Sequence, residues 1–280
     1  MVGQALNQYC KLAGDEVVTY DHRALEIADA DQVKVAILSA TPDAVINCAA
    51  WTDVDGCELN PERALAANAV GPANLAKASR LVGAGFVTIS TDYVFDGQKE
   101  GFYTQRDDPN PQSVYAQSKL EGERRSQLAY ARTIVVRTGF IFGPGGKNFL
   151  STILDRAGRS EPLKAIGNAY GTPTYSRHLA TRLRELAQLD LPGVFHVVNT
   201  GNGVSYEEFA RATLNLGGFE TASLEPVDVD SLNRPAPRPR NSRLKCLFSE
   251  AIGLTALPSW EEALKHFVNS SYETDQARQG

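Results

Sequence analysis

A tyrosine and a lysine four residues apart could together move a proton. Tyr115 and Lys119 stand in the segment Tyr115-Ala-Gln-Ser-Lys119, and positions i and i+4 share one face of a helix. A lysine cation beside a phenol favours the phenolate, so we expect Lys119 to lower the pKa of Tyr115. Such a phenol can donate a proton to a carbonyl oxygen and recover it in the reverse reaction. The same spacing also occurs on surface helices that have no catalytic function.

A second group of polar side chains follows a predicted strand. The segment Ser90-Thr-Asp-Tyr-Val-Phe-Asp-Gly97 comes directly after an apolar run. Ligands of open parallel sheets bind at the carboxyl ends of the strands, so we expect Thr91, Asp92 and Tyr93 at the mouth of a site. Thr91 could hydrogen-bond the same carbonyl as Tyr115. The structural alternative is a strand that ends in an Asp-Gly turn.

Small residues follow another predicted strand, in Asn47-Cys-Ala-Ala-Trp51. Ala49 and Ala50 would let a flat ligand approach the backbone closely, and tight packing of a helix on the sheet is the alternative.

The elements that must position these residues alternate along the chain. Short apolar runs rich in β-branched residues predict strands buried in a parallel sheet, at residues 16–20, 44–48, 86–90, 133–137 and 194–198. Helical patterns separate them, at residues 61–81, 113–128, 176–189 and 205–216, and a last helix begins near Pro258. This order predicts an α/β protein with a doubly wound, Rossmann-like parallel sheet. We expect a dinucleotide-binding domain from residues 1–148 plus 173–202, and a smaller substrate-binding part from 149–172 plus 203–280.

Composition narrows the classes of function. The 280 residues carry a net charge of -5 and a pI near 5.5, which argues against nucleic acid as the main partner. The sequence has neither a long apolar run nor a signal-peptide pattern, so we expect no membrane partner and a cytoplasmic location. The four cysteines and four histidines lack metal-ligand spacing, so no metal site is predicted from the residues. His196 is expected to be a core histidine.

Three motifs in this order resemble a known family. They are Asn47-Cys-Ala-Ala, Ser90-Thr-Asp-Tyr-Val-Phe-Asp-Gly and Val114-Tyr-Ala-Gln-Ser-Lys-Leu-Glu-Gly-Glu. Over nearly the whole chain, the sequence is similar to the extended short-chain dehydrogenases/reductases, and within them to the dTDP-4-dehydrorhamnose reductases. The resemblance implies NADPH- or NADH-dependent reduction of dTDP-4-dehydro-β-L-rhamnose to dTDP-L-rhamnose. A homodimer is left open, as is the Mg²⁺ that some relatives use.

The same resemblance implies roles for individual residues. Tyr115 would be the proton donor, Lys119 would hold the nicotinamide ribose, and Thr91 would orient the keto group. The cofactor would contact both members of the Tyr-Lys pair together with Gly3, Asp21, Arg23, Glu26, Ile27, Ala49, Ala50 and Asn68. An acid at Asp21 suits the ribose of NAD and an arginine at Arg23 suits the phosphate of NADP, so either cofactor is acceptable. The substrate would contact Thr91, Asp92, Tyr93, Phe140 and Asn148.

The sequence departs from the family pattern at its start. The family opens with a strand and a G-x-x-G-x-x-G motif that binds pyrophosphate, whereas here Gly3 matches the last glycine and the first strand is missing. We expect the natural chain to start upstream of Met1, and an inactive truncated chain is the alternative. Phe140 stands where many relatives have Trp, Asn168-Ala169 replaces a common Asp-Gln, and His178 replaces a common Asp.

Two further functions remain open. The first is reduction or epimerisation of another nucleotide sugar on the same fold. The second is a non-catalytic regulatory subunit like that of methionine adenosyltransferase, which has a similar Asp-Tyr-Val-Phe-Asp-Gly stretch and a similar Arg-Pro-Arg-Asn sequence. Arg234, Arg238 and Arg240 could contact the diphosphate of a sugar nucleotide or form a solvated, proline-stiffened loop.

Overall fold

A four-stranded parallel sheet organises the larger part of the molecule and confirms the predicted α/β class. The computed structural model describes residues 1–146 and 148–279, and side chains up to residue 269. The strand order is β1-β2-β3-β8, with every pair parallel. Its strands are β1 (Ala44–Asn47), β2 (Gly85–Thr91), β3 (Thr133–Thr138) and β8 (Gly193–His196). Thr91 pairs with Thr138, so β2 and β3 end side by side.

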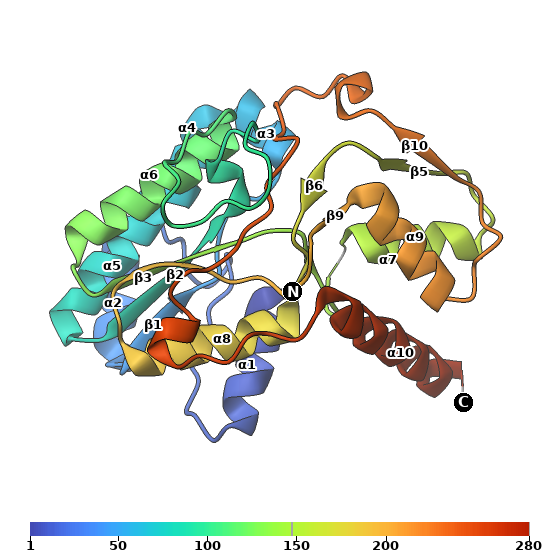
Figure 1. Cartoon of the computed structure of the whole chain (residues 1–280). Coiled ribbons are helices and arrows are strands. Elements are labelled where there is room, and N and C mark those ends of the chain that lie inside the picture. The colour runs from blue at the N-terminus through green and yellow to red at the C-terminus, as the bar shows by residue number, and fades with distance from the viewer. Residues whose placement is uncertain (147, 280) are drawn as a thin grey trace.

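Helices cover both faces of this sheet (Figure 1). One face carries α1 (Val2–Leu12) and α8 (Ser176–Leu189), and the other carries α2 (Ala30–Ala40), α5 (Gly71–Val82) and α6 (Val114–Ala129). Neighbouring residues of β2 show why both faces are apolar. Val87 packs with α8, whereas Phe86 packs with α2 and α5, because successive side chains of a strand point to opposite faces.

The predicted helix over residues 61–81 is present but is interrupted. Its parts are α4 (Pro61–Leu65), the π-helical turn η1 (Ala66–Val70) and α5. Pro61 occupies the first turn, and the side chain of Asn60 accepts a hydrogen bond from the Arg63 amide at 3.1 Å. Single π-helical turns inside helices often mark functional sites, and this one carries Asn68. The short helix α3 (Val54–Leu59) precedes it.

A second, smaller group of elements lies beside the sheet (Figure 1). Strand β5 (Leu163–Ile166) pairs in parallel with β10 (Leu224–Val227), and α7 (Phe149–Gly158) and α9 (Tyr206–Leu216) pack on them. The last helix, α10 (Trp260–Gln279), begins near the predicted position. Short pairs connect the two groups, namely β4 (Ile141–Phe142) with β7 (Thr174–Tyr175) and β6 (Tyr170–Gly171) with β9 (Val204–Ser205). The turns η2 (Asp92–Val94), η3 (Val229–Leu232) and η4 (Glu250–Ile252) complete the elements.

The prediction of a strand at residues 16–20 is wrong. These residues form no ladder with any described strand, and Val18 and Tyr20 are 59% and 46% exposed. A β-strand persists only where a neighbour satisfies its backbone hydrogen bonds, and the sole ladder of β1 within the described residues is with β2. β-branched composition alone therefore did not produce a strand here.

Candidate active site

The structure brings Tyr115, Lys119 and Thr91 together at the carboxyl end of β2. Tyr115 lies in the first turn of α6, after the N-cap Ser113, whose hydroxyl accepts the Ala116 amide at 3.3 Å. Tyr115 and Lys119 are both buried on this helix. Thr91 is the last residue of β2, and its hydroxyl makes a hydrogen bond with the Tyr115 phenol. The predicted constellation is thus a compact group from one strand and one helix.

The Tyr115 phenol retains its proton strongly in the protein alone. Burial raises its pKa, and the hydrogen bond with Thr91 opposes this only in part. We expected Lys119 to lower the Tyr115 pKa, but the net direction is upward, because desolvation of a buried phenolate outweighs the favourable interactions. A phenol in this state is suited to donate a proton to a carbonyl oxygen.

Lys119 is a buried cation whose ammonium group can donate more than one hydrogen bond. Burial lowers its pKa to about 8, and the charge of Glu123 is the largest influence opposing that shift. Its ammonium group donates a hydrogen bond to the Ile89 carbonyl at 2.7 Å. An ammonium group has three donors, so Lys119 fits the ribose hydroxyls of a bound nicotinamide nucleotide.

Asp92 adds a buried acid to this group. Its carboxylate accepts the Thr91 hydroxyl at 3.1 Å, and burial raises its pKa to about 6 while hydrogen bonds with Ser242 and Thr91 oppose that shift. The backbone of Gly139, just after β3, passes so close that a Cβ there would lie 2.3 Å from the Asp92 carboxyl. A glycine at this point therefore makes room for the acid.

A small pocket lies between the two groups of elements. It is lined by Tyr93, Phe140, Tyr206, Arg238 and Ser242, among others. The rings of Phe140 and Tyr206 stack with centroids 4.1 Å apart, and the rings of Tyr93 and Tyr115 meet edge to face at 6.3 Å. An aromatic, partly cationic pocket next to a proton donor suits a sugar nucleotide.

The lining includes residues that sequence reasoning did not assign to the site, among them Tyr206 and Ser242. The capping pattern at Ser205 placed Tyr206 in the first turn of a helix, and that capping box is present, with Ser205 and Glu208 bonded reciprocally at 2.8 and 3.1 Å. Nothing in the sequence connected this helix to the end of β2.

Asn68 fastens the segment after β1 to α6. Its side-chain oxygen accepts the Trp51 amide at 2.8 Å, and its nitrogen donates to the Trp51 carbonyl at 3.0 Å and to the Ser118 hydroxyl at 3.1 Å. Ala49 and Ala50 therefore lie on a fixed segment between β1 and α6. Gly3 in α1 is near the start of this segment, because a Cβ on Gly3 would lie 3.6 Å from that of Cys48.

Other predicted contact residues have local roles in the structure. Asp21 accepts the Arg23 amide at 2.9 Å, and Asp21, Arg23 and Glu26 are all exposed in the connection between α1 and α2. Ile27 packs against Gly71 of α5. Asn148 is the N-cap of α7, and its side chain accepts two backbone amides at 3.1 Å, so its predicted substrate contact gains no support from this geometry.

The three arginines of the proline-rich stretch differ in position. Arg238 forms two hydrogen bonds with Asp55 of α3, at 3.0 and 2.9 Å, and lines the pocket. Arg234 lies 3.9 Å from the same carboxylate. Arg240 pairs instead with Asp230 and lies outside the pocket-lining set. Arg238 is therefore the arginine of this stretch placed for an anionic substrate.

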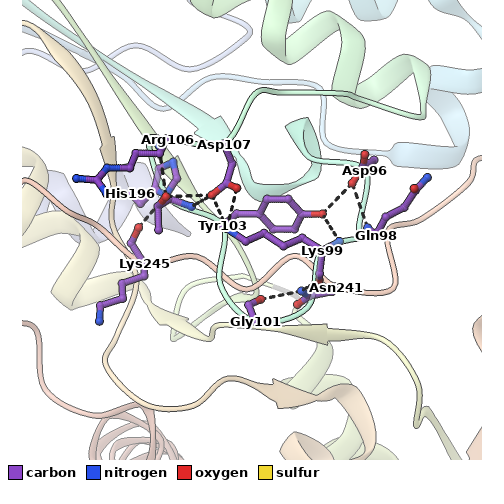
Figure 2. A network of polar contacts seen from close by, with 11 residues as sticks. Asp96, Gln98, Lys99, Gly101, Tyr103, Arg106, Asp107, His196, Asn241 and Lys245 are labelled. Atoms are coloured by element: carbon purple, nitrogen blue, oxygen red, sulfur yellow. Dashed lines mark hydrogen bonds and ion pairs between the residues drawn. The ribbon is translucent and has the colours of Figure 1, made fainter.

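A polar network holds the segment that carries Ser242 (Figure 2). The Tyr103 hydroxyl donates to Asp96 at 2.8 Å, and the Asn241 side chain donates to the Gly101 carbonyl at 2.7 Å. His196 lies beside this network, with Nδ1 3.1 Å from the Lys245 carbonyl. His196 is 2% exposed, which confirms the prediction of a core histidine, and burial lowers its pKa to about 4.

No group of three or more His, Cys, Asp or Glu side chains in the described part of the chain could hold a metal ion, so the magnesium expectation gains no support. No helix among those residues combines the length and apolar character needed to cross a membrane.

Comparisons with known proteins agree with the motifs. The model of the RmlD substrate binding domain family matches residues 1–273. The dTDP-4-dehydrorhamnose reductase of Mycolicibacterium smegmatis is 37% identical over 96% of this chain and 82% of its own length. The crystal structure of such a reductase from Clostridium acetobutylicum superimposes with a TM-score of 0.93 at 34% identity, covering 97% of this chain and 96% of that one. The Bacillus anthracis reductase in complex with NADP gives a TM-score of 0.92 at 32% identity, covering 96% and 95%. With motifs, site geometry and similarity along nearly its whole length in agreement, this chain belongs to the RmlD substrate binding domain family, together with these dTDP-4-dehydrorhamnose reductases.

Proposed function

We propose that this protein is an NAD(P)H-dependent reductase that converts dTDP-4-dehydro-β-L-rhamnose to dTDP-L-rhamnose. The observation that carries the proposal is the group of Tyr115, Thr91 and Lys119 at the carboxyl end of β2, beside a pocket lined by aromatic rings and Arg238. Relatives that match nearly the whole chain are reductases of this substrate, and one of them was crystallised with NADP.

The residues divide the chemistry between them. A bound nicotinamide nucleotide supplies the hydride. Tyr115, whose pKa burial raises, donates its proton to the keto oxygen of the sugar, and Thr91 hydrogen-bonds the same oxygen and orients it. Lys119 binds the ribose of the cofactor, and its charge stabilises the phenolate that remains after proton transfer. Arg238, already ordered by Asp55, binds the diphosphate.

We also propose the two-part division of the chain given above, in which the sheet domain binds the cofactor and the smaller part binds the sugar nucleotide. The cofactor contacts proposed at Gly3, Asp21, Arg23, Glu26, Ala49 and Ala50 belong to the first of these. Because Asp21 and Arg23 are only two residues apart and both exposed, we expect NADH and NADPH both to be accepted. The homodimer and the cytoplasmic location stay predictions. Light scattering of the purified protein measures its molar mass and so tests the homodimer.

The test is oxidation of NADPH and NADH, followed by absorbance, with enzymatically made dTDP-4-dehydrorhamnose and with other 4-keto sugar nucleotides. Turnover of the first substrate by the wild-type chain, lost in Tyr115→Phe, supports the proposal. Preferential turnover of another sugar nucleotide would show that the substrate is a different one, while the proposed reduction by Tyr115, Thr91 and Lys119 would stand. Cofactor binding without any turnover, together with co-purification with methionine adenosyltransferase, would favour the regulatory subunit instead.

A further inference from the structure

Beneath the reactive pair lies a buried charged cluster made of Glu123, Arg137 and Ser90. Arg137 binds Glu123 through two nitrogens, with Nη2 2.7 Å from Oε2 and Nε 3.0 Å from Oε1. Their side chains are 7% and 3% exposed. The Ser90 hydroxyl donates a short hydrogen bond to the same carboxylate. A buried ion pair is weak evidence for stability, because desolvation offsets the attraction, so a functional reason for this cluster is worth seeking.

The cluster is connected to Lys119 through both of its elements. Tyr115, Lys119 and Glu123 follow each other at intervals of four residues on α6, so they share one face of the helix. On β2, the Ile89 carbonyl accepts the Lys119 ammonium group at 2.7 Å, and the next residue, Ser90, binds Glu123. Consecutive residues of one strand therefore fix the lysine and the glutamate side by side.

Lys119 needs such a neighbour to remain charged. Burial disfavours the ammonium ion, and Glu123 is the strongest of the charges that favour it; the thiol of Cys48 contributes less. The other charged or titratable groups near this face are Asp92, which acts on Tyr115, and Arg137 and His196, which lie beyond Glu123 on β3 and β8. Arg137 holds the carboxylate in place through its two hydrogen bonds to Glu123.

We propose that Glu123 is a positioning residue of the active site: its carboxylate, fixed by Arg137 and Ser90, is the counter-charge that keeps Lys119 protonated and so sets the alkaline limit of the reaction. The inference rests on the proposed reductase function, in which a charged Lys119 binds the ribose and stabilises the phenolate of Tyr115. It assigns a function to the Gly-Glu end of the motif that runs from Val114 to Glu123.

The test compares the pH dependence of kcat/KM in the wild type and in Glu123→Gln. Loss of the carboxylate charge lowers the Lys119 pKa. The alkaline limb of the pH profile, where kcat/KM falls as Lys119 loses its proton, therefore moves to lower pH. A unit charge one helical turn away, at about 6 Å, in an effective dielectric of about 20 corresponds to a shift of at most about two pH units. Because the paired Arg137 offsets part of this field, we expect about one unit. A uniform loss of activity with an unmoved limb would overturn the proposal.

The same helix offers a matched control. Glu121 is partly exposed and pairs with Arg125 at 2.7 Å, so Glu121→Gln removes an equal charge from the solvent side of α6. Exposed charges are screened by water and salt. The alkaline limb of this variant should stay where it is in the wild type, and a shift as large as that of Glu123→Gln would show that any charge on α6 has the effect.

Folding and function are separated by two further measurements. Glu123→Gln leaves Arg137 unpaired in the core, which is destabilising, whereas the double variant Glu123→Gln/Arg137→Gln removes both charges and should still move the limb downward. An NMR titration of Lys119 in the ligand-free protein needs no substrate and no variant. A Lys119 that is neutral at neutral pH in the wild type would overturn the inference. If the Lys119 pKa falls in the two Glu123 variants but the wild type turns over no keto-sugar nucleotide, the inference about Glu123 stands and the proposed reductase function is wrong.

Discussion

Replacement of Gly122 by alanine should separate α6 from the π-helical turn that carries Asn68. A Cβ at Gly122 would lie 2.1 Å from the Asn68 carbonyl oxygen and 3.2 Å from its carbonyl carbon. Ordinary contact begins at 3.4 Å, so the two backbones would have to move apart by about 1 Å. The obstacle is backbone on both sides, and no flexible side chain can turn away to relieve it.

The expected cost follows from this geometry. Overpacking of a close-packed interior destabilises by about 1–3 kcal/mol, which outweighs the gain of up to about 1 kcal/mol from replacing glycine by alanine inside a helix. In a protein of this size the melting temperature falls by about 2–4 °C per kcal/mol. Activity should fall further, because a displacement of about 1 Å of the helix that carries Tyr115 costs roughly 100-fold in rate.

Gly158→Ala is the matched control. This glycine is the last residue of α7, and a Cβ there would meet nothing within 4 Å. It should therefore be neutral or slightly stabilising and leave turnover unchanged. Thermal and urea unfolding of both variants, with kcat and KM for the sugar nucleotide, measure the contrast. Equal stability and activity of the two variants would refute the reasoning about close backbone approach.

The other predictions concern single side chains. Tyr115→Phe should lower kcat by about 10²- to 10⁴-fold, the usual contribution of a general acid, while NADPH binding measured by fluorescence is retained; a smaller loss would remove Tyr115 as the proton donor. Burial raises the pKa of Asp92 to about 6 in the folded state, from an ordinary value of 3.8, so the folded state binds the proton more tightly and stability falls as pH rises through that window. The linkage amounts to about 3 kcal/mol, and urea unfolding of Asp92→Asn should lose this pH dependence; an unchanged slope would contradict the buried acid. Arg238→Met should raise KM for the sugar nucleotide by about tenfold or more, since a hydrogen bond to a charged group contributes roughly 1.5–3 kcal/mol. In Arg240→Met, the exposed control, KM should change little, and equal effects in the two variants would contradict the assignment of Arg238 to the pocket.

The sequence by itself determined most of the fold and the reactive pair. Parallel strands need a buried, continuous apolar run, and four such runs became the sheet. The spacing of Tyr115 and Lys119 is a property of the helix alone, and that helix formed over Val114–Ala129. The apolar strand before Thr91 likewise placed that hydroxyl at a strand end, because strand direction and sheet type follow from local pattern.

Tertiary structure decided what no local pattern contains. Residues 16–20 have strand composition but no neighbour among the described strands, and pairing is a non-local condition. Tyr206 and Ser242 reach the site from segments more than a hundred residues beyond Thr91 along the chain. Burial also raised the pKa of Tyr115, where the sequence had led us to expect a lower one. Desolvation depends on everything packed around a group and not only on its neighbours in the chain. The same holds for Glu123, whose pairing with Arg137 and Ser90 exists only where α6 crosses two strands.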